Sequence, residues 1–178
     1  RRVATHHALF HQRKSFVMRP SKPPRCLLAL KYIEVSQEAV GIPSEFDFTT
    51  YELRCPDCGC DKLQVFAPMI EENVPNSPIE VRCAECHLSA QLFDRNRDGY
   101  DAEVEECGDA EDKGPLNFWA CSACGRSSGK LFASFGYQYA VDEGEVPDQI
   151  QNFFDAFILT HICEETKRPS VVAVFECA

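Results

Sequence analysis

No apolar run in this sequence is long enough to cross a membrane. The longest early run, Cys26–Leu30, has five residues, whereas a signal-peptide core needs about 7–15 and a helical membrane span about 20. We therefore expect a soluble protein with no membrane partner. Its cysteine usage, described below, indicates a reducing compartment, which predicts a cytoplasmic location.

Acidic residues are absent from the first 33 positions. Eight Lys/Arg give this segment a charge of +8, and the rest of the chain carries −18, so that the net charge is −10. The basic arm is a candidate nucleic-acid-binding tail, and the alternative is a disordered basic lead-in over residues 1–25. An acidic body repels a phosphate backbone, so nucleic-acid binding would depend on the arm alone. The charge therefore favours another protein as the partner.

Several catalytic patterns are also missing. The sequence has no Ser/His/Asp arrangement, no phosphate-binding glycine loop and no H-E-x-x-H pattern. This favours a protein that is not an enzyme. The enzyme class that stays open is one that uses an open thiolate–zinc site or a redox-active C-x-x-C pair.

Cysteine, in contrast, is abundant. The chain has eleven cysteines, and six of them form three C-x-x-C knuckles at positions 55/58, 83/86 and 121/124. An odd total fits a disulfide framework poorly, and cysteines three positions apart are typical of metal coordination or redox chemistry. The knuckles therefore indicate metal binding.

The first two knuckles predict a complete zinc site. Cys55, Cys58, Cys83 and Cys86 supply the four thiolates that tetrahedral Zn²⁺ needs. The 24 residues between the knuckles exceed the usual gap of about 15–20, which a longer loop accommodates. The residues CPDCGC and CAEC resemble a zinc ribbon, a resemblance that covers residues 46–94. Four protein ligands leave no open position, so we expect structural Zn²⁺, with iron as the alternative metal.

The third knuckle predicts a second site that lacks a ligand. Cys121, Cys124 and Cys163 are present, but Thr166 stands where a fourth cysteine would fall. The site has lost its metal, or a neighbouring group completes it, or Zn²⁺ keeps an open position for water. The neighbouring groups that could complete it are His161, Cys177 and a carboxylate. One zinc ion is thus expected, and a second is an open alternative.

Strand-like segments flank the knuckles and predict the fold. They cover residues 26–35, 46–53, 62–66, 79–82, 89–93, 117–120 and 130–135. C-x-x-C-G followed by a K-L-x-x-F-like strand occurs after both Cys55 and Cys121, which indicates a weak internal repeat, with chance similarity as the alternative. We expect a β-rich α+β fold of two tandem zinc-ribbon-like units, the second degenerate.

One amphipathic helix is predicted in the second unit, near residues 147–158. Apolar residues at 150, 153, 154, 157 and 158 have helical spacing, and Pro147 suits a first turn. The predicted domains are the lead-in (1–25), a zinc-ribbon unit with the intact site (26–104), an acidic linker (105–116) and a second ribbon-like unit with the incomplete site and the helix (117–178).

Residues 94–105 match the calcium-loop pattern D-x-[DN]-x-[DN]-G-x5-E. Asp94, Asn96, Asp98 and Glu105 offer the oxygen ligands that Ca²⁺ prefers. A strand is predicted before this segment, however, where a calcium loop would follow a helix. A solvated acidic turn is therefore the favoured interpretation, and bound calcium is the alternative.

These observations together predict a small soluble zinc-binding protein that acts as a protein-interaction or regulatory module. Nucleic-acid binding through the basic arm is the first alternative, and an enzyme with an open thiolate–zinc or redox C-x-x-C site is the second.

Overall fold

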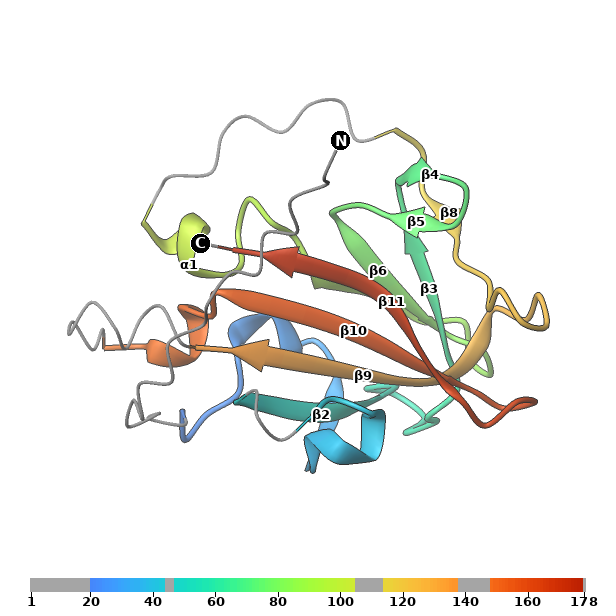
Figure 1. Ribbon diagram of the computed structural model, residues 1–178, viewed down its shortest axis with the longest axis horizontal. Coiled ribbons are helices and arrows are strands. Elements are labelled where there is room, and N and C mark those ends of the chain that lie inside the picture. Colours follow the sequence, from blue (N-terminus) through green and yellow to red (C-terminus); the bar gives the residue numbers. More distant parts are fainter. Residues whose placement is uncertain (1–19, 44–46, 105–113, 138–147, 178) are drawn as a thin grey trace, which may run out of the picture.

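The computed structural model describes residues 20–43, 47–104, 114–137 and 148–177 (Figure 1). These residues form one nine-stranded antiparallel sheet and a separate two-stranded hairpin, β4–β5. The strands are β1 (Lys31–Val35), β2 (Phe48–Arg54), β3 (Leu63–Ala67), β4 (Met69–Glu71), β5 (Val74–Pro75), β6 (Ile79–Cys83), β7 (Ser89–Phe93), β8 (Asn117–Phe118), β9 (Ser128–Gly136), β10 (Ala156–Cys163) and β11 (Pro169–Glu176). The helical segments are the four-residue α1 (Tyr100–Glu103) and 3₁₀ turns at Arg25–Leu27, Gln37–Val40 and Ile150–Asn152.

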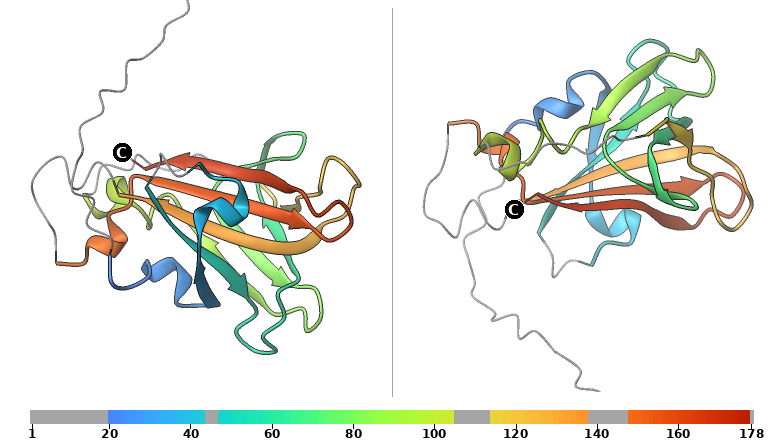
Figure 2. Two further views of the ribbon diagram at one scale, coloured as in Figure 1. Left: turned by 60° about the horizontal axis from the view of Figure 1, so that its bottom comes forward. Right: turned by 90° about the horizontal axis from the view of Figure 1, so that it is seen from above.

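β9 is the strand at which the sheet branches. One edge of β9 pairs with β10, which pairs in turn with β11. The other edge pairs with β2 near its C-terminal end and with β3 at its first residues. β2 then leads to β1, while β3 leads to β6 and β7. In Figure 1, β3 and β6 run at a steep angle to β9 and β10, so the sheet has two arms, which Figure 2 shows from two further sides.

The hydrophobic core lies between these arms and draws on both halves of the chain. Phe93 from β7 stacks on Phe157 from β10, with ring centroids 4.5 Å apart. Phe135 from β9 lies 5.4 Å from the same Phe157 ring. All three side chains are fully buried. β9 from the second half lies between β2 and β3 from the first half, both halves share one core, and the longest α-helix among the described residues has four residues, so the predicted α+β fold of two tandem ribbon units is wrong.

The predicted amphipathic helix near residues 147–158 is also wrong. Residue 147 lies outside the described residues, Ile150–Asn152 form a single 3₁₀ turn, and Ala156 already begins β10. The apolar residues with helical spacing overlap the first residues of β10. Within that strand burial follows the alternation of a strand, with Phe157 and Leu159 both buried. β-branched residues at 158, 160 and 162 stabilise an extended backbone there. Phe157 therefore reaches the core from a strand, and Phe154 reaches it from the segment just before that strand.

Several strand predictions agree with the structure. Residues 89–93 form β7 as predicted, and residues 79–82 fall within β6. The first predicted strand, residues 26–35, is shorter, because Arg25–Leu27 form a 3₁₀ turn and β1 begins at Lys31. The predicted lead-in and acidic linker lie mostly outside the described residues, in segments 1–19 and 105–113.

Candidate metal centre

Four turns connect the strands that carry the cysteines. The first cysteine of each turn stands at or just after the end of a strand: Cys55 after β2, Cys83 at the end of β6, Cys121 after β8 and Cys163 at the end of β10. The turns lead into β3, β7, β9 and β11, respectively. The fourth turn, Cys163–Thr166, is thus placed in the sheet as the three C-x-x-C knuckles are.

All four turns have the same backbone hydrogen bond. The N–H four residues after the first cysteine donates to the carbonyl of that cysteine, in the pairs Gly59/Cys55, His87/Cys83, Gly125/Cys121 and Lys167/Cys163, at 3.1, 3.1, 2.7 and 2.9 Å. The donating residue has a positive φ in each turn: 74° at Gly59, 61° at His87, 73° at Gly125 and 55° at Lys167. Glycine adopts this conformation freely, whereas His87 and Lys167 do so against their steric preference. The fourth turn therefore keeps the knuckle shape without a second cysteine.

Backbone N–H groups also face the second cysteine of each knuckle. The N–H groups of Cys60, Leu88 and Arg126 each act to lower the pKa of the thiol two residues earlier. Burial and the neighbouring thiols act in the opposite direction and have the larger combined effect, so the pKa of each of these thiols is raised. Donors aimed at sulfur stabilise the thiolate, which is the form that binds a metal.

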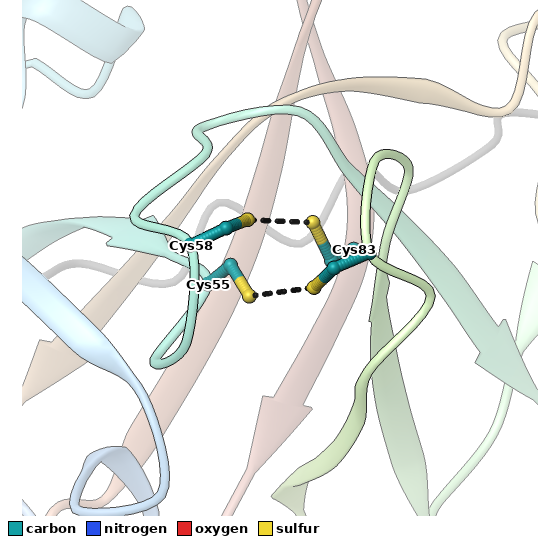
Figure 3. A group of neighbouring side chains, drawn as sticks. Cys55, Cys58 and Cys83 are labelled. Carbon is teal, nitrogen blue, oxygen red and sulfur yellow. Dashed lines mark hydrogen bonds between the residues drawn. The ribbon is translucent and has the colours of Figure 1, made fainter.

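The first group, Cys55, Cys58, Cys83 and Cys86, comes together as predicted. The Sγ atoms of Cys55 and Cys86 lie 3.4 Å apart, and those of Cys58 and Cys83 lie 3.5 Å apart (Figure 3). All four sulfurs lie within 4.8 Å of one another. Tetrahedral zinc with bonds of about 2.3 Å places its sulfurs about 3.8 Å apart. The first group could therefore hold a metal ion with little rearrangement.

The thiols of the first group affect one another strongly. Burial acts to raise the pKa of Cys83, but the N–H groups of Cys86 and Glu85 outweigh it and lower that pKa to about 7. The Leu88 N–H acts to lower the pKa of Cys86, but the thiols of Cys55, Cys83 and Cys58 raise it to about 12. Cys83 therefore loses its proton readily, whereas Cys86 keeps its proton, because two thiolates so close together repel each other. A bound dication removes that repulsion.

The second group, Cys121, Cys124 and Cys163, is brought together by the third and fourth turns. Its sulfurs lie within 4.8 Å of one another, and those of Cys124 and Cys163 are 3.3 Å apart. Cys121 and Cys163 are buried, whereas Cys124 is exposed. The Thr166 N–H lowers the pKa of Cys163 to about 7, against the effect of burial. These three residues could also hold a metal ion.

Neither His161 nor Cys177 joins the second group among the described residues. Cys177 lies at the opposite end of the β10–β11 hairpin, beside Gly99. His161 is fully buried, and its ring meets that of Trp119 edge to face at 5.0 Å. Both ring nitrogens lack a hydrogen-bond partner. Burial lowers the pKa of His161, which favours the neutral form of the ring, and the Ser128 backbone acts in the opposite direction.

The calcium-loop pattern forms a hydrogen-bonded turn. Asp98 is buried, and its carboxylate accepts the Asp94 N–H at 2.8 Å and lies 3.7 Å from Nε of Arg25. The Asp94 carboxylate accepts the Asn96 N–H at 3.2 Å. Glu105 lies outside the described residues. Within the described residues, these carboxylates form no group that could hold a metal, so calcium binding stays an untested alternative.

The two groups lie on one row of paired residues across the sheet. Cys163 pairs with Gly129, Gly129 pairs with Leu63, and Leu63 pairs with Cys83. Cys163 and Cys83 are thus three strands apart, and at about 4.8 Å for each strand spacing the distance between them is about 15 Å. A salt bridge of 3.2 Å between Lys62 and Glu164 also connects the loop beside the first group to the fourth turn. The groups are therefore neighbours, yet too far apart to share one metal ion.

The sequence did not predict the positive φ of Lys167 or the knuckle-like shape of the fourth turn. The signal for the glycine turns was present, because Gly59 and Gly125 follow their second cysteines directly. The signal at His87 is weaker, because histidine adopts a positive φ less often than glycine does, and no such signal marks Lys167.

No protein-family model, curated protein or solved structure matches the chain. No helix among the described residues is long and apolar enough to span a bilayer.

Proposed function

We propose that this chain is a structural zinc protein that acts as a protein-interaction module. The observation that supports zinc binding is the convergence of four sulfurs from two knuckles to within 4.8 Å. Thiolates favour Zn²⁺ among the common divalent ions, and four protein ligands leave it no open position for catalysis. Zinc in the first group joins the β2–β3 connection to the β6–β7 hairpin. β3, which follows the first knuckle, pairs directly with β6, which leads into the second, so the metal crosslinks two turns on adjacent strands whose cysteines Cys58 and Cys83 are 25 positions apart in the sequence.

A groove beside the third knuckle supports the interaction role. It has a volume of about 900 Å³ and is lined by the β4–β5 hairpin and by β8 with the start of the third knuckle. Its apolar side chains include Ile70 and Phe118, which are 67% and 60% exposed. Apolar side chains gathered at one groove are a feature of protein-interaction sites. The groove is therefore the proposed contact surface.

The walls of the groove are held in place by one side chain. Asn73 has a φ of 63° in the β4–β5 turn. Its amide donates to the Ala120 carbonyl at 2.7 Å and accepts the Ala120 N–H at 2.9 Å. This pair of bonds imitates strand pairing and fixes the hairpin against the segment that enters the third knuckle, so that the groove exists before a partner binds.

Charge indicates what the partner carries. Glu71 and Glu72 line the same groove, and the whole chain has a net charge of −10. A partner segment with apolar side chains flanked by Lys or Arg complements both the shape and the charge. We propose such a segment of another protein as the occupant. In the basic arm, Arg25 is already paired with Glu103 at 2.7 Å and with Asp98, which does not favour the nucleic-acid alternative.

Metal content tests the zinc part of this proposal. A variant that carries both Cys121→Ser and Cys163→Ser retains the first group intact, so we expect the purified variant to contain one zinc ion per chain by elemental analysis. The wild-type protein is the control for total metal. A variant without zinc, or with iron instead, would contradict the proposal.

A random-peptide display library tests the interaction part. We expect the protein to select peptides that combine apolar and basic residues, and Phe118→Asp to weaken their binding by about tenfold or more, as for a central interface anchor. Val174→Asp is the matched control, because Val174 is equally exposed, at 59%, but lies on β11 outside the groove. Failure to enrich peptides, or equal weakening by both substitutions, would reject this surface.

A further inference from the structure

The fourth turn keeps the hydrogen-bond donors of a thiolate site. In the three knuckles, an N–H two residues after the second cysteine faces its sulfur. In the fourth turn, the equivalent Arg168 N–H donates to Oγ1 of Thr166 at 3.4 Å. The threonine hydroxyl therefore stands where a second thiolate stands in the other turns. A hydroxyl is not among the usual protein ligands of zinc, so this position lacks a strong donor.

The carboxylates of the fourth turn form salt bridges with cationic side chains. Glu164 pairs with Lys62 at 3.2 Å, and Glu165 pairs with Arg126 at 2.8 Å. Both acids belong to the fourth turn, yet neither belongs to the second group among the described residues. The nearest carboxylates are thus engaged by cations and do not supply a fourth ligand.

His161 lies on the interior side of the second group. It precedes Cys163 by two residues on β10, and a Cβ placed on Gly129 would lie 2.3 Å from its Nε2, so the ring covers Gly129 inside the sheet. Thr166, in contrast, is only partly buried, and Cys124 beside it is exposed. The position that lacks a donor is therefore on the side of the group that faces solvent.

We propose that the second group binds Zn²⁺ through Cys121, Cys124 and Cys163 and that its fourth position, beside Thr166, accepts an external thiolate. The inference goes beyond the proposed structural role, because the first group has no such position. A thiol loses its proton to solvent, and the resulting thiolate displaces the solvent molecule at the fourth position. The completed set of four sulfurs then equals that of the first group, where Cys86 occupies the corresponding place.

Cobalt substitution tests the proposal directly. Co²⁺ occupies tetrahedral thiolate sites in place of Zn²⁺, and its sulfur-to-metal charge-transfer absorption increases with each coordinated thiolate. We expect the metal-depleted protein to take up two Co²⁺ ions per chain, one for each group. Titration with 2-mercaptoethanol should then raise the charge-transfer absorption to a saturating value.

Thr166→Cys and Thr166→Ser are the matched variants. Thr166→Cys supplies the fourth thiolate from the protein, so its second Co²⁺ should bind about tenfold more tightly or better and show no response to 2-mercaptoethanol. Thr166→Ser keeps the hydroxyl and should respond as the wild type does. Cys163→Ser should lose the response and one Co²⁺ while the other ion remains, which separates this inference from zinc binding at the first group.

Three results would overturn the inference. The first is a wild-type protein that binds only one Co²⁺ while Cys163→Ser changes nothing. The second is two bound ions with no response to the thiol, which would mean that the protein fills the fourth position. The third is loss of the second ion in His161→Gln, which would identify the buried imidazole as the missing ligand.

Discussion

Cys83→Ser is expected to remove the zinc ion of the first group and to abolish cooperative unfolding at room temperature. A structural zinc site contributes about 10–16 kcal/mol in small zinc domains, which is comparable to the whole stability of about 5–15 kcal/mol of a typical domain. Cys83 is buried at the end of β6 and is the first-group thiol whose pKa is lowered to about 7. Zinc content and thermal unfolding followed by circular dichroism measure the two effects together.

Cys60→Ser is the matched control for this substitution. Cys60 is the thiol nearest in sequence to the first group, but its sulfur accepts the Lys62 N–H at 3.3 Å and is not one of the four grouped sulfurs. Serine retains an acceptor, so we expect full zinc content and a loss of stability of about 1 kcal/mol or less. Equal behaviour of the two variants would refute a structural metal in the first group.

Phe157→Ala has the second-largest expected effect, a loss of about 3–5 kcal/mol in the free energy of unfolding. The Phe157 side chain is fully buried, stacks on Phe93 with an interplanar angle of 10° and contacts Phe135. These rings come from three strands of the two arms, so truncation leaves a cavity where the arms meet. Denaturant unfolding of the zinc-loaded protein measures the change.

Val174→Ala serves as the control for Phe157→Ala. Val174 pairs with Ile158 on the adjacent strand but is 59% exposed, so its truncation should change stability by about 0.5 kcal/mol or less. A comparable loss in both variants would mean that the core does not lie between the two arms.

Local features of the chain could be predicted because they depend on neighbours in the sequence. The cysteine spacing indicated both groups, and the structure brings each of them together. The alternation of residues 89–93 and 79–82 was sufficient to predict β7 and β6. Gly59, which directly follows the first knuckle in the sequence, has the positive φ that glycine adopts freely.

The arrangement of the strands could not be predicted in this way. Pairing of Tyr51 with Ala133 joins strands that are far apart in the sequence, and no local pattern specifies such a partner. The helix prediction failed for a related reason, because Phe154 and Phe157 have helical spacing, whereas in the fold Phe154 precedes β10 and only Phe157 lies on that strand. Their packing against Phe93 and Phe135, which come from other strands, cannot be read from the local spacing.

The incomplete second group was visible in the sequence, but its geometry was not. Thr166 could be recognised as a missing cysteine, whereas the choice among His161, Cys177 and an open position depended on the fold. Cys177 is excluded because it lies at the opposite end of the β10–β11 hairpin. His161 shares a face of β10 with Cys163, but its ring packs against Trp119 and Gly129 and does not join the three grouped sulfurs.

The position of β9 has a consequence for how the chain is made. Synthesis from the N-terminus delivers β2 and β3 well before Ser128–Gly136, the strand that pairs with both of them. During that interval each of the two earlier strands has an unpaired edge, which can pair with a neighbouring nascent chain. Zinc bound at the first group needs only residues up to Cys86, so it can hold the two knuckles together while the ribosome completes β9. If the proposed zinc binds the first group, we expect its supply during translation, rather than after it, to reduce aggregation of the growing polypeptide.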